Sequence, residues 1–132
     1  MERAILTLLM ATASAGATAG WVKVDSHPVG TKHVDPTAIE KTGNTVKALV
    51  LVDFRAVQGP PLDSPFRSLI LQNEYDCGKK QVRGLSYANF AGPMASGEMV
   101  QVNRKAGAPS DWYSAVSPSG KLDLALEYVC KK

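Results

Sequence analysis

Histidine and cysteine are scarce in this chain, whose 132 residues contain only two of each. The cysteines lie far apart and form no Cys-x-x-Cys pair, so a thiol redox centre is not indicated. His27 and His33 have only Asp25 and Asp35 as neighbouring ligands, across residues typical of a turn. Protein metal sites combine several ligands in a defined geometry. We therefore expect two solvated loop histidines and no metal.

Catalytic sequence motifs are also missing. No serine lies in a Gly-x-Ser-x-Gly setting, and no Gly-x-Gly-x-x-Gly or phosphate-binding loop is present. Glu74 and Asp76 form the clearest carboxylate pair, but Lys79, Lys80 and Arg83 follow them closely and would balance their charge. The sequence therefore predicts a protein that is not an enzyme and has no cofactor.

The chain has neither a strong charge of one sign nor a long hydrophobic run. Its net charge is +3, and its basic residues are scattered, so nucleic-acid binding is not expected. Its longest apolar segment, 4–11, is too short to span a bilayer. With 45% hydrophobic and 20% charged residues, the composition is that of an ordinary globular protein, and the length suits one domain.

The first nineteen residues predict a secretion signal. The apolar segment 4–11 is followed by small residues, among which Ala17-Thr18-Ala19 is the preferred cleavage site. The alternative is a buried N-terminal helix. We expect a signal peptide at 1–19 and a mature domain at 20–132, located in the periplasm, secreted or at the cell surface. No cysteine follows the predicted cleavage site, so the acceptor for a bacterial lipid anchor is absent there.

In an exported chain, two cysteines most simply form one disulfide. A bond between Cys77 and Cys130 would close a loop of 54 residues. On the chain-entropy account, such a bond destabilises the unfolded chain by about 4 kcal/mol. The alternative is two free thiols.

Most of the mature chain has the residue pattern of β-strands. We predict an antiparallel sheet because successive strands have short connections. Strands are expected at 20–25, 44–57, 66–77, 79–90, 99–104 and 112–116. Residues 26–35 are expected to turn back, and 35–43 to form one or two helical turns that start with Asp35 and Pro36 and stop at Gly43.

Residues 117–132 predict a C-terminal helix, with Ser117 as the N-cap and Pro118 at its first position. Leu122, Leu126 and Val129 recur at helical spacing and form one apolar face beside Cys130. The disulfide would hold this face across the sheet.

Five residues are candidates for binding. Trp112 and Tyr113 follow a Gly/Pro loop and could anchor an interface, although Trp112 could equally cap the core. The disulfide would bring Lys79, Lys80 and Arg83 toward the C-terminal lysines. The neighbouring carboxylates nearly balance this charge, so a solvated surface is the alternative to a polyanion site.

Several segments together resemble the bacterial surface-adhesin protein E family. They are "KHVDPTAIEKTGNTVKALVLVDF", "SLILQNEYDC", "VRGLSYANF", "SDWYSAV" and the final "YVC". The resemblance covers nearly all of the mature chain. It implies an α+β fold, with a mainly antiparallel sheet of about six strands and a C-terminal helix stapled by a disulfide. It also implies binding to a protein partner, such as host extracellular matrix. The alternatives are a carrier of a small, haem-like apolar ligand in a pocket between sheet and helix, and an envelope enzyme or inhibitor.

Overall fold

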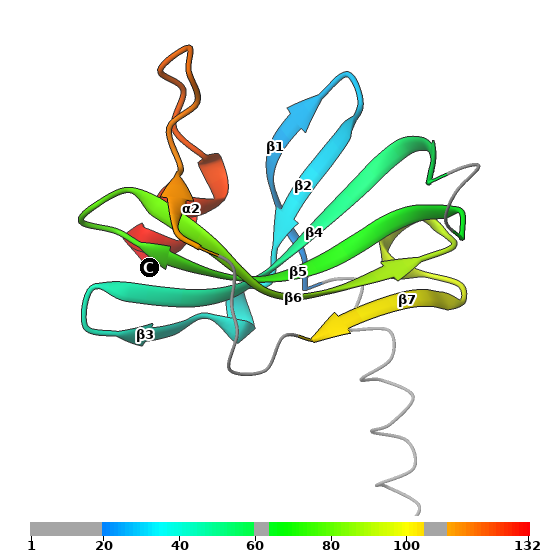
Figure 1. Cartoon of the computed structure of the whole chain (residues 1–132), viewed down its shortest axis with the longest axis horizontal. Coiled ribbons are helices and arrows are strands. Elements are labelled where there is room, and N and C mark those ends of the chain that lie inside the picture. The colour runs from blue at the N-terminus through cyan, green and yellow to red at the C-terminus, as the bar shows by residue number, and fades with distance from the viewer. Residues whose placement is uncertain (1–19, 60–63, 105–110) are drawn as a thin grey trace, which may run out of the picture.

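The computed structural model describes residues 20–59, 64–104 and 111–132, which form one antiparallel sheet of eight strands with a C-terminal helix (Figure 1). The elements are β1 (Val22–His27), β2 (Gly30–Val34), η1 (Pro36–Ala38), β3 (Glu40–Thr42), β4 (Thr45–Gln58), β5 (Phe66–Asp76), β6 (Gln81–Phe90), η2 (Pro93–Ala95), β7 (Met99–Arg104), β8 (Tyr113–Ser114) and α2 (Leu124–Lys131). Six strands follow the order β1-β2-β4-β5-β6-β7, while β3 pairs with β4 and β8 pairs with β6. The predicted fold class is therefore confirmed, and β2 and β3 are the two strands that were not predicted.

Strand β4 lies in the middle of the sheet, as its apolar sequence predicts. It pairs with β2 on one side and with β5 on the other. Val46, Ala48 and Val50 alternate along it and are buried on one face, and Leu51 is buried on the other. A strand that is apolar on both faces can be stable only where both faces are covered.

The segment 26–35 was predicted to be a turn, and this prediction is wrong for most of its length. Only Pro28 and Val29 separate β1 from β2, which continues as a regular strand to Val34. The pairing of β2 with β4 places His33 opposite Leu51. A polar-looking sequence thus becomes a strand because the exposed edge of β4 provides its hydrogen-bonding partners.

Gly30 begins β2 at a point of close backbone approach. A side-chain carbon at this position would lie 2.2 Å from the backbone oxygen of Asp53. The absence of a side chain therefore allows β2 to pair with β4 from its first residue.

The predicted helix at 35–43 is a single 3-10 turn. The Asp35 side chain accepts a hydrogen bond from the Thr37 backbone N–H at 2.9 Å, as expected of an N-cap. The chain then forms β3 and turns at Gly43, which has a φ of +63°, into β4. Pairing with the first residues of β4 satisfies the backbone groups that a longer helix would have satisfied internally.

The C-terminal helix is shorter than predicted. It begins at Leu124, after the N-cap Asp123, whose side chain accepts a hydrogen bond from the Ala125 backbone N–H at 2.8 Å. Ser117 instead caps a turn by accepting from the Lys121 N–H, and Leu122 forms a β-bridge with Val116. The isolated bridge thus replaces the first predicted helical turn.

The predicted disulfide is confirmed: Cys77 and Cys130 are bonded, with their Cα atoms 5.8 Å apart. Helix α2 packs its buried Ala125, Leu126 and Val129 against a core that the sheet supplies. The buried members of this core are Val34, Val46, Ala48, Val50, Tyr75, Val82, Ala115, Ala125, Leu126 and Val129.

Candidate functional site

The structure brings the five predicted binding residues to one end of the sheet, and we call them the aromatic–cationic surface. Lys79 and Lys80 lie in the turn between β5 and β6, and Arg83 lies on β6. Tyr113 on β8 pairs with Val82 of β6, which also brings Trp112 alongside. A backbone hydrogen bond of 2.9 Å from the Ala115 N–H to the Lys80 oxygen fixes the turn against the segment that carries the aromatic residues.

Trp112 is held by the side chain of Arg83. The guanidinium carbon of Arg83 lies 4.5 Å from the centroid of the Trp112 ring, within the range of a cation–π interaction. The same guanidinium donates to the nearly buried carboxylate of Glu74 on β5, with nitrogen–oxygen distances of 2.8 and 2.9 Å. The Arg83 side chain on β6 therefore links Glu74 on β5 to Trp112, the residue before β8. Trp112 is half-buried, so it covers the sheet and keeps part of its ring accessible.

Tyr113 is the most accessible aromatic residue of this surface, with 56% of its area exposed. Partial burial of its hydroxyl end raises the pKa of Tyr113, and the nearby carboxylate of Asp123 adds to this rise. Like any tyrosine hydroxyl at neutral pH, it is protonated and able to donate a hydrogen bond.

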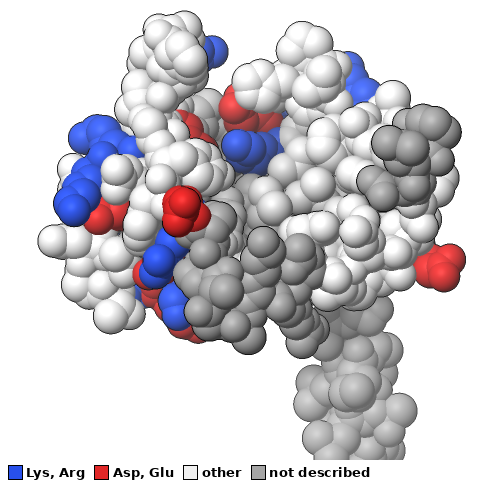
Figure 2. All heavy atoms as spheres, in the orientation of Figure 1, with Lys and Arg blue, Asp and Glu red and all other residues white. Residues whose placement is uncertain are grey.

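The lysines of the surface are exposed, and the described residues contain no ion pair to either ammonium group. Asp76 uses a side-chain oxygen to accept from the Lys79 backbone N–H at 3.0 Å. Figure 2 shows basic side chains gathered over the β5–β6 turn, whereas the opposite end of this face is mostly uncharged. The neighbouring carboxylates of Glu74 and Glu127 are engaged by Arg83 and Lys131. Each of these pairs removes one charge of each sign, so the net charge of the region stays as small as the sequence predicts.

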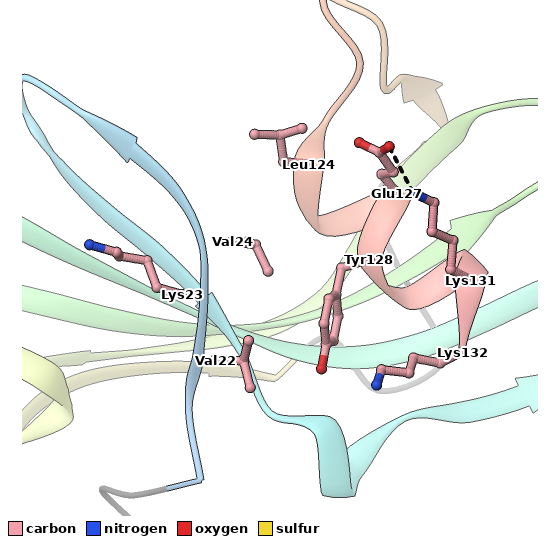
Figure 3. A pocket seen from close by; sticks show the side chains of 8 residues that line it. All are labelled: Val22, Lys23, Val24, Leu124, Glu127, Tyr128, Lys131 and Lys132. Carbon is pink, nitrogen blue, oxygen red and sulfur yellow. Dashed lines mark hydrogen bonds and ion pairs between the residues drawn. The ribbon is translucent and has the colours of Figure 1, made fainter.

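A second concave surface lies between β1 and α2, and we call it the helix groove. Its volume is about 570 Å³. In Figure 3 the Tyr128 ring stands between the helix and the strand, with Val22 and Val24 on its side of β1 and Lys23 pointing to the other side. The groove is lined by Val22, Lys23, Val24, Leu124, Glu127, Tyr128, Lys131 and Lys132. Of these residues, the sequence pointed only to Lys131 and Lys132, as part of the polyanion site that was weighed against a solvated surface.

The charges of the helix groove are mainly positive. Glu127 pairs with Lys131 at 3.1 Å, one helical turn away. The Lys132 ammonium lies 5.0 Å from the centroid of the Tyr128 ring. Lys41 of β3 donates to the backbone oxygen of Lys132 and thus fixes the end of the helix. One cation therefore lies beside the Tyr128 ring, in a groove that both apolar and charged residues line.

A smaller cavity of about 310 Å³ continues on the other side of Leu124, which borders both cavities. Its lining combines apolar side chains with two polar pairs: His27 lies 2.8 Å from Asp25, and Lys32 lies 3.7 Å from Asp123. No group of three or more potential metal ligands occurs in the described ranges 20–59, 64–104 and 111–132.

His33 was predicted to be a solvated loop residue, and this prediction is wrong. It lies on β2 and is buried, with its Nε2 atom 2.9 Å from the Thr31 hydroxyl. Burial lowers the pKa of His33, while the negative charge of Asp53 opposes this effect. His27, at the end of β1, is exposed.

Comparison with known proteins connects this geometry to one family. Residues 21–131 match the family described as surface-adhesin protein E. No curated protein sequence is significantly similar to the chain. Two structures of Haemophilus influenzae protein E share its fold at 14% sequence identity. The first has a TM-score of 0.60 and aligns over 85% of this chain and 84% of its own. The second, crystal form II, has a TM-score of 0.62 over 85% and 87%.

A third structure, protein E from non-typeable Haemophilus influenzae, aligns over 85% of this chain and 76% of its own, with a TM-score of 0.59 and 14% identity. Structural similarity at so low a sequence identity shows that the fold is shared and nothing further. No helix in the part of the chain that the structure describes is long and apolar enough to cross a membrane.

Proposed function

Because this chain belongs to the surface-adhesin protein E family, we propose that it is an exported, non-enzymatic binding protein that adheres to a protein partner such as an extracellular-matrix protein. The partner would bind the aromatic–cationic surface. Residues 1–19 would be removed on export, with cleavage after Ala19, and the mature domain would act at the cell surface or as a secreted protein.

The observation that carries this proposal is the convergence of five side chains from separate segments on one end of the sheet. Interfaces are enriched in tyrosine, tryptophan and arginine, which combine a rigid apolar body with a polar group. Here Arg83 positions Trp112, while Tyr113 remains exposed beside it. The exposed Lys79 and Lys80 would draw an acidic partner toward these aromatic residues.

The alternative of a small-ligand carrier has less support. It requires a pocket between the sheet and the helix, where the buried side chains of Leu126, Val129 and Tyr75 pack together. The cavities lie at the borders of this interface and are open to solvent. An enclosed pocket that buries most of its ligand is typical of carriers of apolar molecules.

Binding of the mature domain to immobilised laminin, fibronectin and collagen tests the proposal. Surface plasmon resonance should detect binding to at least one of these proteins. Tyr113→Ala, and separately the double change Lys79→Ala and Lys80→Ala, should weaken that binding. Met99→Ala is the matched control because Met99 is similarly exposed on β7, at the far edge of the sheet.

Three outcomes count against the proposal in different ways. If none of the matrix proteins binds, matrix adhesion is wrong. If one binds and Met99→Ala weakens it while the other variants do not, the site lies at the β7 edge. If haem titration gives a stoichiometric absorbance change while the matrix proteins fail, the carrier alternative replaces the proposal.

A further inference from the structure

The smaller cavity lies between the β1–β2 hairpin and the segment that leads into α2, and we call it the hairpin cavity. Its volume is about 310 Å³, and Leu124 separates it from the helix groove. In Figure 2 the surface is hollowed between the hairpin and this segment, and side chains of both charge signs gather there. Residues far apart in the sequence, from β1, β2, β8 and the start of α2, therefore meet around one opening.

Lys32 of β2 and Asp123, the N-cap of α2, face one another in this cavity without a direct hydrogen bond. The Lys32 Nζ atom lies 3.7 Å from the Asp123 Oδ1 atom, which is an ion-pair distance but too long for a hydrogen bond. That Oδ1 atom already accepts from the Ala125 N–H. Among the described residues, the Asp123 Oδ2 atom accepts no hydrogen bond, and the Lys32 ammonium group donates none. Only 30% of the Lys32 side chain and 19% of the Asp123 side chain are exposed.

Tyr113 adds a third polar group that has no partner within the part of the chain that the structure describes. Burial raises the pKa of Tyr113, and the negative charge of Asp123 adds to this rise, so the hydroxyl lies near that carboxylate. Folding has already removed part of the water around these groups, which lowers the desolvation cost of binding a ligand there. The three groups together thus have the properties of a preorganised polar site.

The chemistry of these groups indicates which ligand they fit. An ammonium group only donates hydrogen bonds and a carboxylate only accepts them, whereas a hydroxyl does both. A ligand hydroxyl between Lys32 and Asp123 would accept from the first and donate to the second, and both bonds would be charge-assisted. Lys32 and Lys121 balance Asp25 and Asp123 in the lining, so the cavity favours a ligand without net charge.

The remaining lining is largely apolar and would contact the C–H groups of a ligand. Val82, Leu122 and Leu124 contribute aliphatic side chains, and the Tyr113 ring lies beside them. Ligand pockets typically combine such a lining with a few fixed polar groups, and a volume of about 310 Å³ is at the lower end of their range. The cavity therefore fits one small ring that has both hydroxyl and C–H surfaces.

We propose that the hairpin cavity binds a neutral sugar in its pyranose form, either free or at the end of a glycan. One hydroxyl would bridge Lys32 and Asp123, and a neighbouring hydroxyl would accept from Tyr113. A C–H face of the ring would rest on Leu122 and Leu124. This site shares Tyr113 with the aromatic–cationic surface, but it does not depend on binding of a matrix protein.

Nuclear magnetic resonance of the ¹⁵N-labelled mature domain tests the proposal with the methyl glycosides of galactose, glucose and mannose. At least one glycoside should shift the backbone amide signals of Ser114, Ala115 and Asp123 in a saturable way. The signals of Gln101 and Val102 on β7 should not move. Glycerol, which carries hydroxyls but no ring, should give no saturable shift. Glucuronic acid should bind more weakly than the neutral glycosides, because its carboxylate is repelled by Asp123.

Protein variants locate the polar contacts. Asp123→Asn keeps the N-cap and replaces the free acceptor by a donor, and it should weaken binding about tenfold. Lys32→Met should have a similar effect, and Tyr113→Phe should weaken binding about threefold through the lost hydroxyl. Lys47→Met is the matched control, with the same loss of charge at an exposed position of β4, and it should leave the affinity within about twofold. The amide spectrum of each variant shows whether the fold is retained.

Serum albumin that carries the binding hexose on its lysines distinguishes the two sources of the sugar. Binding of this albumin and of the free glycoside would identify the end of a glycan as the ligand, and binding of the free glycoside alone would identify a free sugar. Either result supports the site.

Four results would overturn the proposal. The first is the absence of a saturable shift with all three glycosides, and the second is a shift confined to other parts of the sheet. The third is tighter binding of glucuronic acid than of glucose. The fourth is an equal effect of Lys32→Met and Lys47→Met. Tyr113→Phe lies outside α2, so it tests the site even if Asp123→Asn does not fold. Because no matrix protein is used, failure here leaves the function proposed for the aromatic–cationic surface standing.

Discussion

The guanidinium of Arg83 lies over the ring of Trp112, with 4.5 Å between the guanidinium carbon and the ring centroid. The same group is the partner of the Glu74 carboxylate, so one side chain joins the interior of the sheet to an accessible aromatic residue. Arg83 therefore positions Trp112, and the predictions for this end of the sheet depend on that coupling.

Arg83→Ala should destabilise the fold and release Trp112. It leaves the nearly buried Glu74 carboxylate without its cation, which should cost about 1–3 kcal/mol. Tryptophan emission, measured in a Trp21→Phe background, should shift to longer wavelength because the Trp112 ring gains contact with water. Adding Glu74→Gln should recover part of the stability while leaving the emission shifted. An emission spectrum that Arg83→Ala leaves unchanged would contradict the positioning role.

The disulfide and the apolar face of α2 should act on the same segment. Cys130→Ser should lower the free energy of unfolding by about 4 kcal/mol through the lost loop constraint. Leu126→Ala should lower it by about 2–5 kcal/mol, since Leu126 is buried against the core. Combined, the two changes should cost less than their sum, because a loosened helix leaves less packing to lose.

Urea unfolding of the two single variants and the double variant measures these costs. Leu124→Ala is the control, because its side chain is partly exposed, and it should cost much less than Leu126→Ala. A strictly additive double variant would show that α2 does not depend on the disulfide for its docking.

His33 should make stability depend on pH. Burial lowers the pKa of His33 below its ordinary value of 6.5, so the unfolded chain takes up the proton first as the pH falls. Its contribution should be fully present above 6.5, decline as the pH falls through 6.5 toward the lower folded pKa, and change no further below that. His33→Gln should remove this step from a plot of unfolding free energy against pH. His27→Gln, at an exposed position, should leave it in place.

Gly30→Ala should be strongly destabilising because of the close backbone approach to Asp53. A side-chain carbon 2.2 Å from a carbonyl oxygen forces β2 and β4 apart, which should cost at least about 1–3 kcal/mol. Gly78→Ala is the matched control, since the nearest atom to its added carbon is 3.6 Å away. Thermal unfolding of both variants measures the difference, and equal melting temperatures would show that the strands adjust without strain.

The sequence predicts the long strands and the disulfide well. The strands have a local pattern of apolar residues, and only two cysteines are available to form a bond. The apolar residues of β4 specify a covered strand, and two cysteines in a predicted exported chain have one natural pairing. Prediction from the sequence fails at β2 and β3. Their residues have weak strand preference, and they become strands by pairing with β4. Tertiary pairing overrides local preference most easily in short segments.

In the candidate sites, too, local residue patterns could be recognised from the sequence, whereas contacts that depend on strand pairing could not. The "DWYS" segment and the lysines near Cys77 were recognisable as exposed candidates for binding, but the position of Arg83 between Glu74 and Trp112 depends on the register of β5, β6 and β8. The helix groove had no sequence signal of its own. Val22 and Tyr128 lie more than one hundred residues apart in the sequence, and they face one another only because α2 is held beside the outermost strand.

The bond between Cys77 and Cys130 also determines how the domain would carry mechanical load. A force applied beyond Cys130 reaches Cys77 directly and bypasses the residues between them. Cys77 follows β5, which lies between β4 and β6 and pairs with both over most of its length. The load therefore acts along a central strand and must shear two hydrogen-bonded ladders at once, whereas an unbonded terminal helix would peel away one turn at a time.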